Sequence, residues 1–244
     1  MAEKILQDIA EQNKRLTIAQ INKNTEEKAE AYYNLGRAYY FLEDFHRAIE
    51  YLEQYLSIAE EVGNRAGSAG CAYGNLGCAY QSLGDSHRAI EYHNQHLRIA
   101  KEVGDRACER KAYSKLGLAY YSLEEFQRAI EYDNQDVSIA KEVGDRAGEG
   151  CAYGNLGCAY KSLGDSQRAI EYHNQHLGIA KEVGDRECEG KAYSNLSHAY
   201  YSLEEFQRVR EYNNKYLSIA KDVGDRAGHR LCLALSCHQL PWQC

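Results

Sequence analysis

Two pairs of histidines in this sequence have the residue type and the spacing of metal ligands. His93 and His96 are three residues apart, and so are His173 and His176, a spacing that allows two imidazoles on one helix to reach the same metal ion. Neither pair has an evident third ligand. We therefore expect these histidines to pack, or to form hydrogen bonds between helices, and we predict no metal site and no cofactor.

The nine cysteines are an odd number, and their spacing does not suit a metal ion either. Cys71 and Cys78, like Cys151 and Cys158, are seven residues apart, which on a helix separates the two thiols by roughly 10 Å. One ion does not bridge that gap. The first residues of the chain carry charges where a signal peptide needs an apolar stretch. These observations favour reduced thiols and a cytoplasmic protein.

The composition is that of an ordered chain without a membrane-spanning segment. Of the 244 residues, 44% are apolar and 27% are charged, the net charge is −7 and the mean hydropathy is −0.65. No apolar run approaches the roughly 18 residues that a membrane span needs. The acidic net charge argues against nucleic acid as a partner.

A motif with a fixed period accounts for most of the chain. The pattern Ala-Tyr-x-(Asn/Lys)-Leu-(Gly/Ser)-x-Ala-Tyr recurs with steps of 41, 40, 40 and 40 residues between its leucines, which are Leu35, Leu76, Leu116, Leu156 and Leu196. The step of 41 comes from one extra residue within 64–70. Residues 71–107 match residues 151–187 at 33 of 37 positions, so the duplicated unit is a pair of repeats. A period of this length is typical of a repeat array.

Carboxylates follow the same period, since Glu91, Glu131 and Glu171 recur once per repeat. A catalytic pair of carboxylates has no reason to be copied identically along an array. We therefore predict that the chain is not an enzyme.

Each repeat holds two apolar stripes with helical spacing, which predict two helices. The stripes are Tyr73, Leu76, Gly77, Tyr80 and Leu83, and then Ala89, Ile90, Tyr92, Leu97, Ile99, Ala100 and Val103. Gly84 and Gly104 follow the stripes and suit the left-handed turn that ends a helix. Asp85 or Ser86, and Asp105, are placed to cap the next helix. In the alternate repeats Glu124 and Glu204 stand where Gly84 would fall, so those turns must close without glycine.

These residues resemble the tetratricopeptide repeat, whose framework they match at Tyr73, Leu76, Gly77, Tyr80, Ala89 and Leu97. The resemblance implies an all-α, right-handed superhelical solenoid of antiparallel helix pairs, in which the first helices line a concave groove that holds an extended peptide. The repeat is 40 residues long where the usual one has 34, and it lacks the proline that often follows the second helix. The longer form is similar to the repeats of Pins-like G-protein signalling modulators and of the tetratricopeptide repeat protein 28 type.

The period also divides the chain into segments. We expect residues 1–27 to form an unpaired second helix of a preceding half repeat, residues 28–228 to form five repeats, and residues 229–244 to form a divergent tail or cap. The half repeat exposes an apolar stripe of Ile9, Leu16 and Ile18, which another array could cover end to end. Residues 231–235 could form a short helix that docks on the last pair.

The first helices carry a row of residues that packing does not use, at i, i+4 and i+7 from Cys71. Nine residues on this row and its extension are predicted to line the groove: Asn34, Arg37, Asn75, Lys111, Lys115, Asn155, Lys161, Lys191 and Asn195. This set contains five basic residues, whereas the row contains a single acidic residue, Glu30. The four asparagines share one position, and each offers a donor and an acceptor to an extended peptide backbone.

The sequence therefore favours a protein-interaction scaffold that grips an extended, acidic peptide segment of a partner. Alternatives remain at the level of single residues, because the asparagines could bond locally and Lys111 and Lys115 could be a solvated pair. Two other functions are also open: a structural array that associates with itself through its terminal half repeats, or a non-catalytic fragment of a larger multidomain signalling protein.

Overall fold

The computed structural model describes residues 2–63 and 65–222, which form eleven α-helices and one short π-helical segment. Two compact units divide the chain, Met1–Leu123 and Glu124–Cys244, and each is described by itself. The first unit holds α1 (Ala2–Ile21), α2 (Thr25–Phe41), α3 (Phe45–Glu61), η1 (Arg65–Ala69), α4 (Gly70–Ser82), α5 (Ser86–Val103) and α6 (Arg106–Ser122). The second holds α7 (Phe126–Val143), α8 (Arg146–Ser162), α9 (Ser166–Val183), α10 (Arg186–Ser202) and α11 (Phe206–Asp222).

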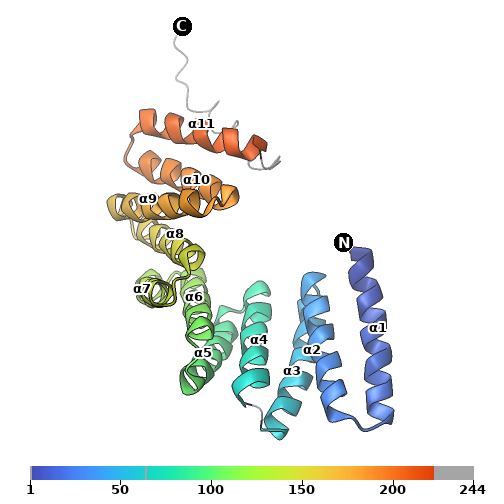
Figure 1. The fold of residues 1–244 in the computed structure, drawn as a ribbon. Coiled ribbons are helices and arrows are strands. Elements are labelled where there is room, and N and C mark those ends of the chain that lie inside the picture. The colour runs from blue at the N-terminus through green and yellow to red at the C-terminus, as the bar shows by residue number, and fades with distance from the viewer. Residues whose placement is uncertain (1, 64, 223–244) are drawn as a thin grey trace. The chain divides into compact units, whose positions relative to one another are not determined.

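Within each unit, every helix packs against the next one along the chain (Figure 1). Two helices recur with each copy of the 40-residue motif, so α2 pairs with α3, α4 with α5, α8 with α9 and α10 with α11. The predicted all-α array of helix pairs is confirmed.

Aspartate side chains begin most of these helices. The Oδ1 atom of Asp85 accepts a hydrogen bond of 3.0 Å from the backbone N–H of Arg88, and that of Asp105 accepts one of 2.9 Å from Cys108. Equivalent bonds begin α3, α8, α9 and α10. Each cap satisfies a backbone N–H that the helix leaves without a partner. Of the two residues that the sequence offered for the start of α5, Asp85 is the cap.

The turns between helices use a left-handed residue, and that residue is not always glycine. Gly84 and Gly104 have φ angles of +81° and +70°, as their positions predict. Glu43, Glu124 and Glu204 adopt φ angles of +60°, +60° and +59° at the copies of the Gly84 position. A side chain in this region costs roughly 1–2 kcal/mol, so these three turns are strained relative to the glycine turns.

The leucines of the repeat motif lie at the centre of the core of each unit. All five are fully shielded from solvent: Leu35, Leu76 and Leu116 in the first unit, and Leu156 and Leu196 in the second. Burying a leucine contributes about 1.5–3 kcal/mol relative to leaving it in water. The repeated motif is therefore first of all a packing motif.

Glycines on the first helix allow the second helix of a pair to approach closely. A Cβ atom at Gly77 would lie 2.4 Å from the His93 ring, and one at Gly36 would lie 2.7 Å from the Leu52 side chain. His93 is fully buried in this contact. Gly157 and His173 repeat the arrangement in the second unit. The prediction that these histidines pack between helices is confirmed.

Most tyrosines are also structural. The Tyr80 and Tyr92 rings stack with centroids 5.2 Å apart and planes 9° apart, and the Arg88 guanidinium lies 4.4 Å from the Tyr80 centroid. The same three-residue contact recurs in the second unit as Tyr160, Tyr172 and Arg168. The tyrosine content thus comes largely from copied contacts within helix pairs.

Helix α1 packs against α2 and buries most of the apolar stripe that we expected it to expose. Ile9 and Leu16 are 8% and 9% exposed and join a core cluster with Ala31 and Leu35 of α2, whereas Ile18 is 44% exposed. The expected exposed stripe is therefore wrong for Ile9 and Leu16. The reason is that the first helix of the following repeat already covers this face.

The predicted tail at 229–244, with its helix at 231–235, lies outside the described residues. Within residues 2–63 and 65–222, none of the helices is both long and apolar enough to cross a lipid bilayer.

Candidate functional site

All nine predicted groove residues lie on the first helices of their pairs. The first unit carries Asn34 and Arg37 on α2, Asn75 on α4, and Lys111 and Lys115 on α6; the second carries Asn155 and Lys161 on α8, and Lys191 and Asn195 on α10. The five basic residues are exposed and the four asparagines are half-buried. A row of this kind leaves the charges in water and holds the amides at the surface of the packed helices.

Two predicted residues of the first unit line one cavity together. Arg37 and Asn75 face a cavity of about 210 Å³ between α2 and α4, whose other walls include the aromatic side chains of Tyr40 and Phe41 and the thiol of Cys78. Among the described residues, Asn75 makes no hydrogen bond to another side chain, so its amide is available to a ligand. This cavity combines a cation, an amide and an aromatic surface.

Lys115 and Lys111 lie on the same unit but do not line that cavity. Burial raises the pKa of the Cys78 thiol, and the positive charge of Lys115 acts against this rise. Burial lowers the pKa of His96, and the positive charge of Lys111 lowers that pKa further. These two lysines therefore place positive charge next to both α4 and α5.

The asparagines of the second unit have partners within the chain. The Nδ2 atom of Asn195 lies 3.8 Å from the Cys158 Sγ, and the side chain of Asn155 hydrogen-bonds to Asp133. Asn34 of the first unit behaves in the same way, because its Nδ2 atom lies 3.4 Å from the Gln12 Oε1. Each amide keeps further donor and acceptor capacity. Any peptide contact by these three residues is shared with an internal bond.

Lys191 is also engaged. Its Nζ lies 2.7 Å from Glu187 Oε1, one turn earlier on α10, and both side chains are largely exposed. An exposed pair of this kind contributes about 0–1 kcal/mol. The second unit therefore offers less unpaired positive charge than the sequence indicates. Of its two predicted lysines, Lys161 is the one without an ion pair among the described residues.

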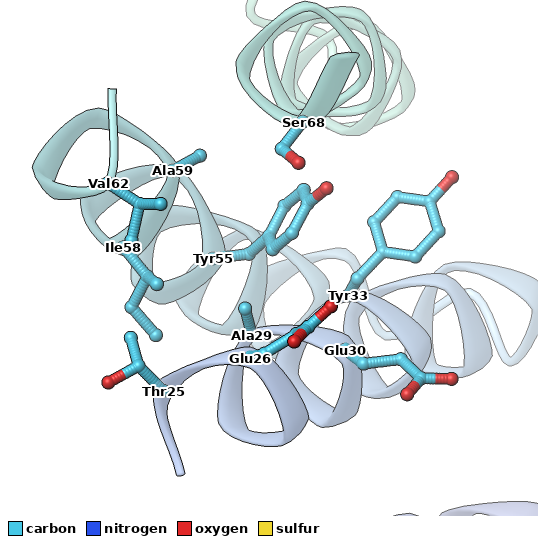
Figure 2. A pocket seen from close by; sticks show the side chains of 10 residues that line it. All are labelled: Thr25, Glu26, Ala29, Glu30, Tyr33, Tyr55, Ile58, Ala59, Val62 and Ser68. Carbon is cyan, nitrogen blue, oxygen red and sulfur yellow. The ribbon is translucent and has the colours of Figure 1, made fainter. Parts of the chain in front are cut away.

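The second cavity of the first unit was not predicted from the sequence. Ten residues from α2, the end of α3 and η1 enclose about 570 Å³, and Figure 2 shows the Tyr33 and Tyr55 rings side by side within it. Its carboxylates are Glu26 and Glu30, so it is acidic where the row is basic. The extra residue within 64–70 was the available signal, because it changes the backbone at this junction into a π-helical segment.

The buried histidines are neutral in the fold. Burial lowers the pKa of His93 and of His173 to about 3, and neither nitrogen of either ring has a hydrogen-bond partner. In the part of the chain that the structure describes, no three His, Cys, Asp or Glu side chains are arranged to hold a metal ion.

A buried acidic pair occupies the same position in the second unit. Asp133 and Asp136 are 2% and 0% exposed. Burial, and next the negative charge of Asp136, raise the pKa of Asp133 to about 8, while the hydrogen bond from Asn155 lowers it. The two aspartates stand where another copy has His173 and His176. The change from imidazole to carboxylate at these positions does not indicate, from the sequence alone, that the aspartates are buried too.

Comparison with protein families decides the identity of the repeat. The model of the family described as tetratricopeptide repeat matches residues 7–61, 27–102, 68–142, 108–182 and 149–222 in overlapping segments. This chain belongs to the tetratricopeptide repeat family. The resemblance drawn from Tyr73, Leu76, Gly77 and Tyr80 is confirmed at this level. The narrower similarity to Pins-like modulators and to the protein 28 type is not shown.

Solved structures share the fold of this tetratricopeptide repeat protein at low sequence identity. BtubC (BKLC) from P. vanneervenii is 20% identical, with a TM-score of 0.77, and the match covers 90% of this chain and 92% of that one. The apo form of the quorum sensor NprR from B. thuringiensis is 19% identical, with a TM-score of 0.79 and coverage of 96% and 66%. A Rap protein complexed with Competence and Sporulation Factor is 16% identical, with a TM-score of 0.67 and coverage of 86% and 64%.

A search of curated proteins finds no match to this sequence.

Proposed function

We propose that this tetratricopeptide repeat protein is a protein-interaction scaffold whose first helices bind an extended, acidic segment of a partner. The observation that carries the proposal is the placement of Arg37 and Asn75 on one cavity of the first unit, with Lys111 and Lys115 exposed on the next first helix, α6. Cations and a free amide on one unit suit carboxylate side chains and a peptide backbone.

Two structural neighbours support a role in recognition. The Rap structure contains Competence and Sporulation Factor, and NprR is a quorum sensor, so arrays with this fold do take part in recognition. Acidic character is our inference from the basic row alone. The second unit contributes less in this proposal, because Lys191 is paired with Glu187 and two asparagines have internal partners.

A selection from random peptides tests the proposal without knowledge of the natural partner. Displayed 12-residue peptides are selected on the full chain, and the enriched peptides are then synthesised and titrated. We expect enrichment in Asp and Glu, and a loss of affinity of at least tenfold in the double variant Lys111→Glu/Lys115→Glu.

A matched control separates the row from general charge. Lys4→Glu/Lys14→Glu makes the same change of net charge at two exposed lysines of α1 that are not members of the row. Equal losses in both double variants, or enriched peptides without acidic residues, would contradict the acidic-peptide proposal. Circular dichroism establishes that each variant keeps its helices.

Self-association is the second candidate, and one observation favours it. Leu6, Ile18 and Ile21 of α1 are 57%, 44% and 75% exposed, although Ile9 and Leu16 are covered by α2. We propose residues 1–27 as the end through which two copies would meet, with residues 28–228 as the five repeats. Sedimentation at several concentrations tests this, and a monomer at all of them would exclude it.

We further propose that the chain binds its partner without catalysing a reaction, and that it acts in the cytoplasm. The first statement rests on the copied carboxylates, and the second on the nine cysteines, whose odd number and spacing favour reduced thiols. A non-catalytic part of a larger multidomain signalling protein is the third candidate.

A further inference from the structure

The acidic cavity of the first unit offers a ligand site of a different kind from the basic row. It lies where the start of α2 meets the end of α3 and η1, and it encloses about 570 Å³. Figure 2 shows Tyr33 from α2 and Tyr55 from α3 as neighbouring rings, with Ser68 of η1 beyond Tyr55. A cavity of this size accommodates a large side chain.

The cavity is open here because this junction departs from the repeat. The copy of the same position in the second unit is a cavity of only about 30 Å³, in which His176, Cys151 and Cys188 stand where the first unit has Tyr55, Glu30 and Ser68. The extra residue within 64–70 turns the chain through the π-helical segment η1 in place of a direct start of the next helix. The space at the junction of α3 with α4 is therefore much larger than its copy in the second unit.

The walls of the cavity are aromatic and apolar. The Tyr33 and Tyr55 ring centroids are 5.0 Å apart with planes 47° apart. Burial raises the pKa of Tyr55, and its hydroxyl hydrogen-bonds to Ser68, which fixes the position of the ring. Ile58 and Ala59 are buried beneath, and Val62 at the rim is 65% exposed. Such walls suit the aliphatic stem of a long side chain.

The charges of the lining are acidic. Glu26 is exposed and forms no ion pair with the described residues, whereas Glu30 is bridged by Arg15 of α1 at 3.0 Å. The lining includes no basic residue. The Arg37 guanidinium, which does not line the cavity, lies 5.7 Å from the Tyr33 centroid, so this ring already accepts a cation. A carboxylate beside two tyrosine rings is complementary to a planar cation.

We propose that this cavity binds an arginine side chain of a protein partner. The guanidinium stacks on the tyrosine rings and donates hydrogen bonds to the Glu26 carboxylate, and the arginine stem lies against Ile58 and Val62. The site goes beyond the proposed function, because it needs neither Lys111 nor Lys115 and takes a ligand of the opposite charge.

A pair of short peptides tests the proposal. The probes are acetyl-Gly-Gly-Arg-Gly-Gly-amide and the same peptide with citrulline, which keeps the shape of arginine and removes its charge. Backbone amide shifts of the ¹⁵N-labelled full chain are followed during each titration. We expect saturable shifts centred on residues 25–33 and 55–62 with the arginine peptide, and at least tenfold weaker binding of the citrulline peptide.

Two conservative variants make the test specific. Glu26→Gln removes the one carboxylate of the lining that has no ion pair among the described residues, without changing the size of the side chain, and we expect it to weaken binding of the arginine peptide about fivefold. Glu27→Gln removes a neighbouring charge that does not line the cavity, and we expect it to leave the affinity unchanged. An unchanged amide spectrum away from the cavity shows that both variants are folded.

Three results would overturn the proposal: equal affinity for the citrulline peptide, shifts that lie outside the cavity, or equal weakening by Glu27→Gln. The outcome is separate from that of the acidic-peptide proposal, because Lys111→Glu/Lys115→Glu should leave the arginine titration unchanged.

Discussion

A single position of the second helix shows how much chemistry this repeat tolerates at one residue. Its five copies are Leu52, His93, Asp133, His173 and Asn213, and all are buried. Burial lowers the pKa of the histidines to about 3 and raises that of Asp133 to about 8. The two kinds of residue therefore make the stability of the array depend on pH in opposite directions.

Replacement of His93 by leucine should remove one source of acid sensitivity. The folded pKa of about 3 lies below the unfolded value, so the neutral ring is fully compatible with folding above about pH 6.5, and stability is lost as the pH falls from there towards 3. At pH 5 this loss is about 2 kcal/mol for one histidine. Leu52 already fills this position against Gly36. Urea unfolding should find His93→Leu more stable than the wild type, by a margin that is larger at pH 5 than at pH 8.

The control for this variant is His87→Gln, an exposed histidine on the same helix whose copy in the second unit is Gln167. It should show the pH dependence of the wild type. A margin for His93→Leu that does not change with pH would mean that the buried ring is not the group that titrates.

Replacement of Asp133 by asparagine should have the opposite pH dependence. The folded pKa of about 8 lies above the unfolded value, so the contribution of Asp133 to stability is most favourable below about pH 4 and is lost as the pH rises towards 8. The loss is on the order of 4 kcal/mol by pH 7. Asn213 is a natural precedent for the amide at this position. Thermal unfolding should show a higher Tm for Asp133→Asn at pH 8 and little difference at pH 4, while the exposed Glu131→Gln changes neither.

At the scale of elements, the turn between the two helices of a pair is the part that varies. Gly84 and Gly164 adopt the left-handed conformation with φ of +81° and +83°, and Glu43, Glu124 and Glu204 adopt it with φ near +60°. The backbone geometry is conserved while the residue changes, so the turn is imposed by the packing of the flanking helices rather than by the turn residue.

Exchange of the turn residues should therefore move stability both ways. Glu43→Gly relieves a left-handed side chain and should stabilise the first unit by about 0.5–1 kcal/mol, because the greater freedom of glycine in the unfolded chain offsets part of the gain. Gly84→Ala introduces the strain and should destabilise it by about 1 kcal/mol, although no atom lies within 4 Å of the added methyl group. Chemical unfolding of both variants checks this, and stabilisation by Gly84→Ala would contradict it.

The elements were the most predictable part of the molecule. The apolar stripes around Leu76 and Leu97 and the stops at Gly84 and Gly104 depend on local chain geometry, which sequence spacing reports directly. Burial of Asp133 could not be read from the sequence, because its cost is met by a protonation state and by a bond from Asn155. The burial of Ile9 differs from the expected exposure because the half repeat packs against the first helix of the following repeat, α2.

At the scale of the whole molecule, charge is what distinguishes binding surfaces from scaffold. The chain carries a net charge of −7, yet its first helices present Arg37, Lys111, Lys115 and Lys161 to solvent. The row could be predicted because it repeats with the period. The cavity near Tyr55 could not be predicted. It follows from the π-helical backbone at one junction, where an extra residue interrupts the 40-residue period.

Binding of an acidic peptide to exposed lysines should depend on salt. The screening length falls from about 10 Å at 0.1 M to about 3 Å at 1 M, so the attraction between exposed charges should largely disappear over this range. Fluorescence anisotropy of a selected acidic peptide should show affinity falling at least tenfold between 0.05 M and 0.5 M NaCl. Affinity that is independent of salt would indicate an apolar contact in place of the lysines.

The proposed binding surface on the first helices is tested most directly by a map of where a selected acidic peptide binds. Amide shifts of the ¹⁵N-labelled chain are recorded with increasing peptide. We expect the largest shifts in the first unit to fall on the first helices, at and beside Arg37, Asn75, Lys111 and Lys115, and Lys111→Glu/Lys115→Glu to abolish them. Shifts concentrated on the second helices α3 and α5, or shifts that persist in the double variant, would contradict the claim that the first helices form the binding surface.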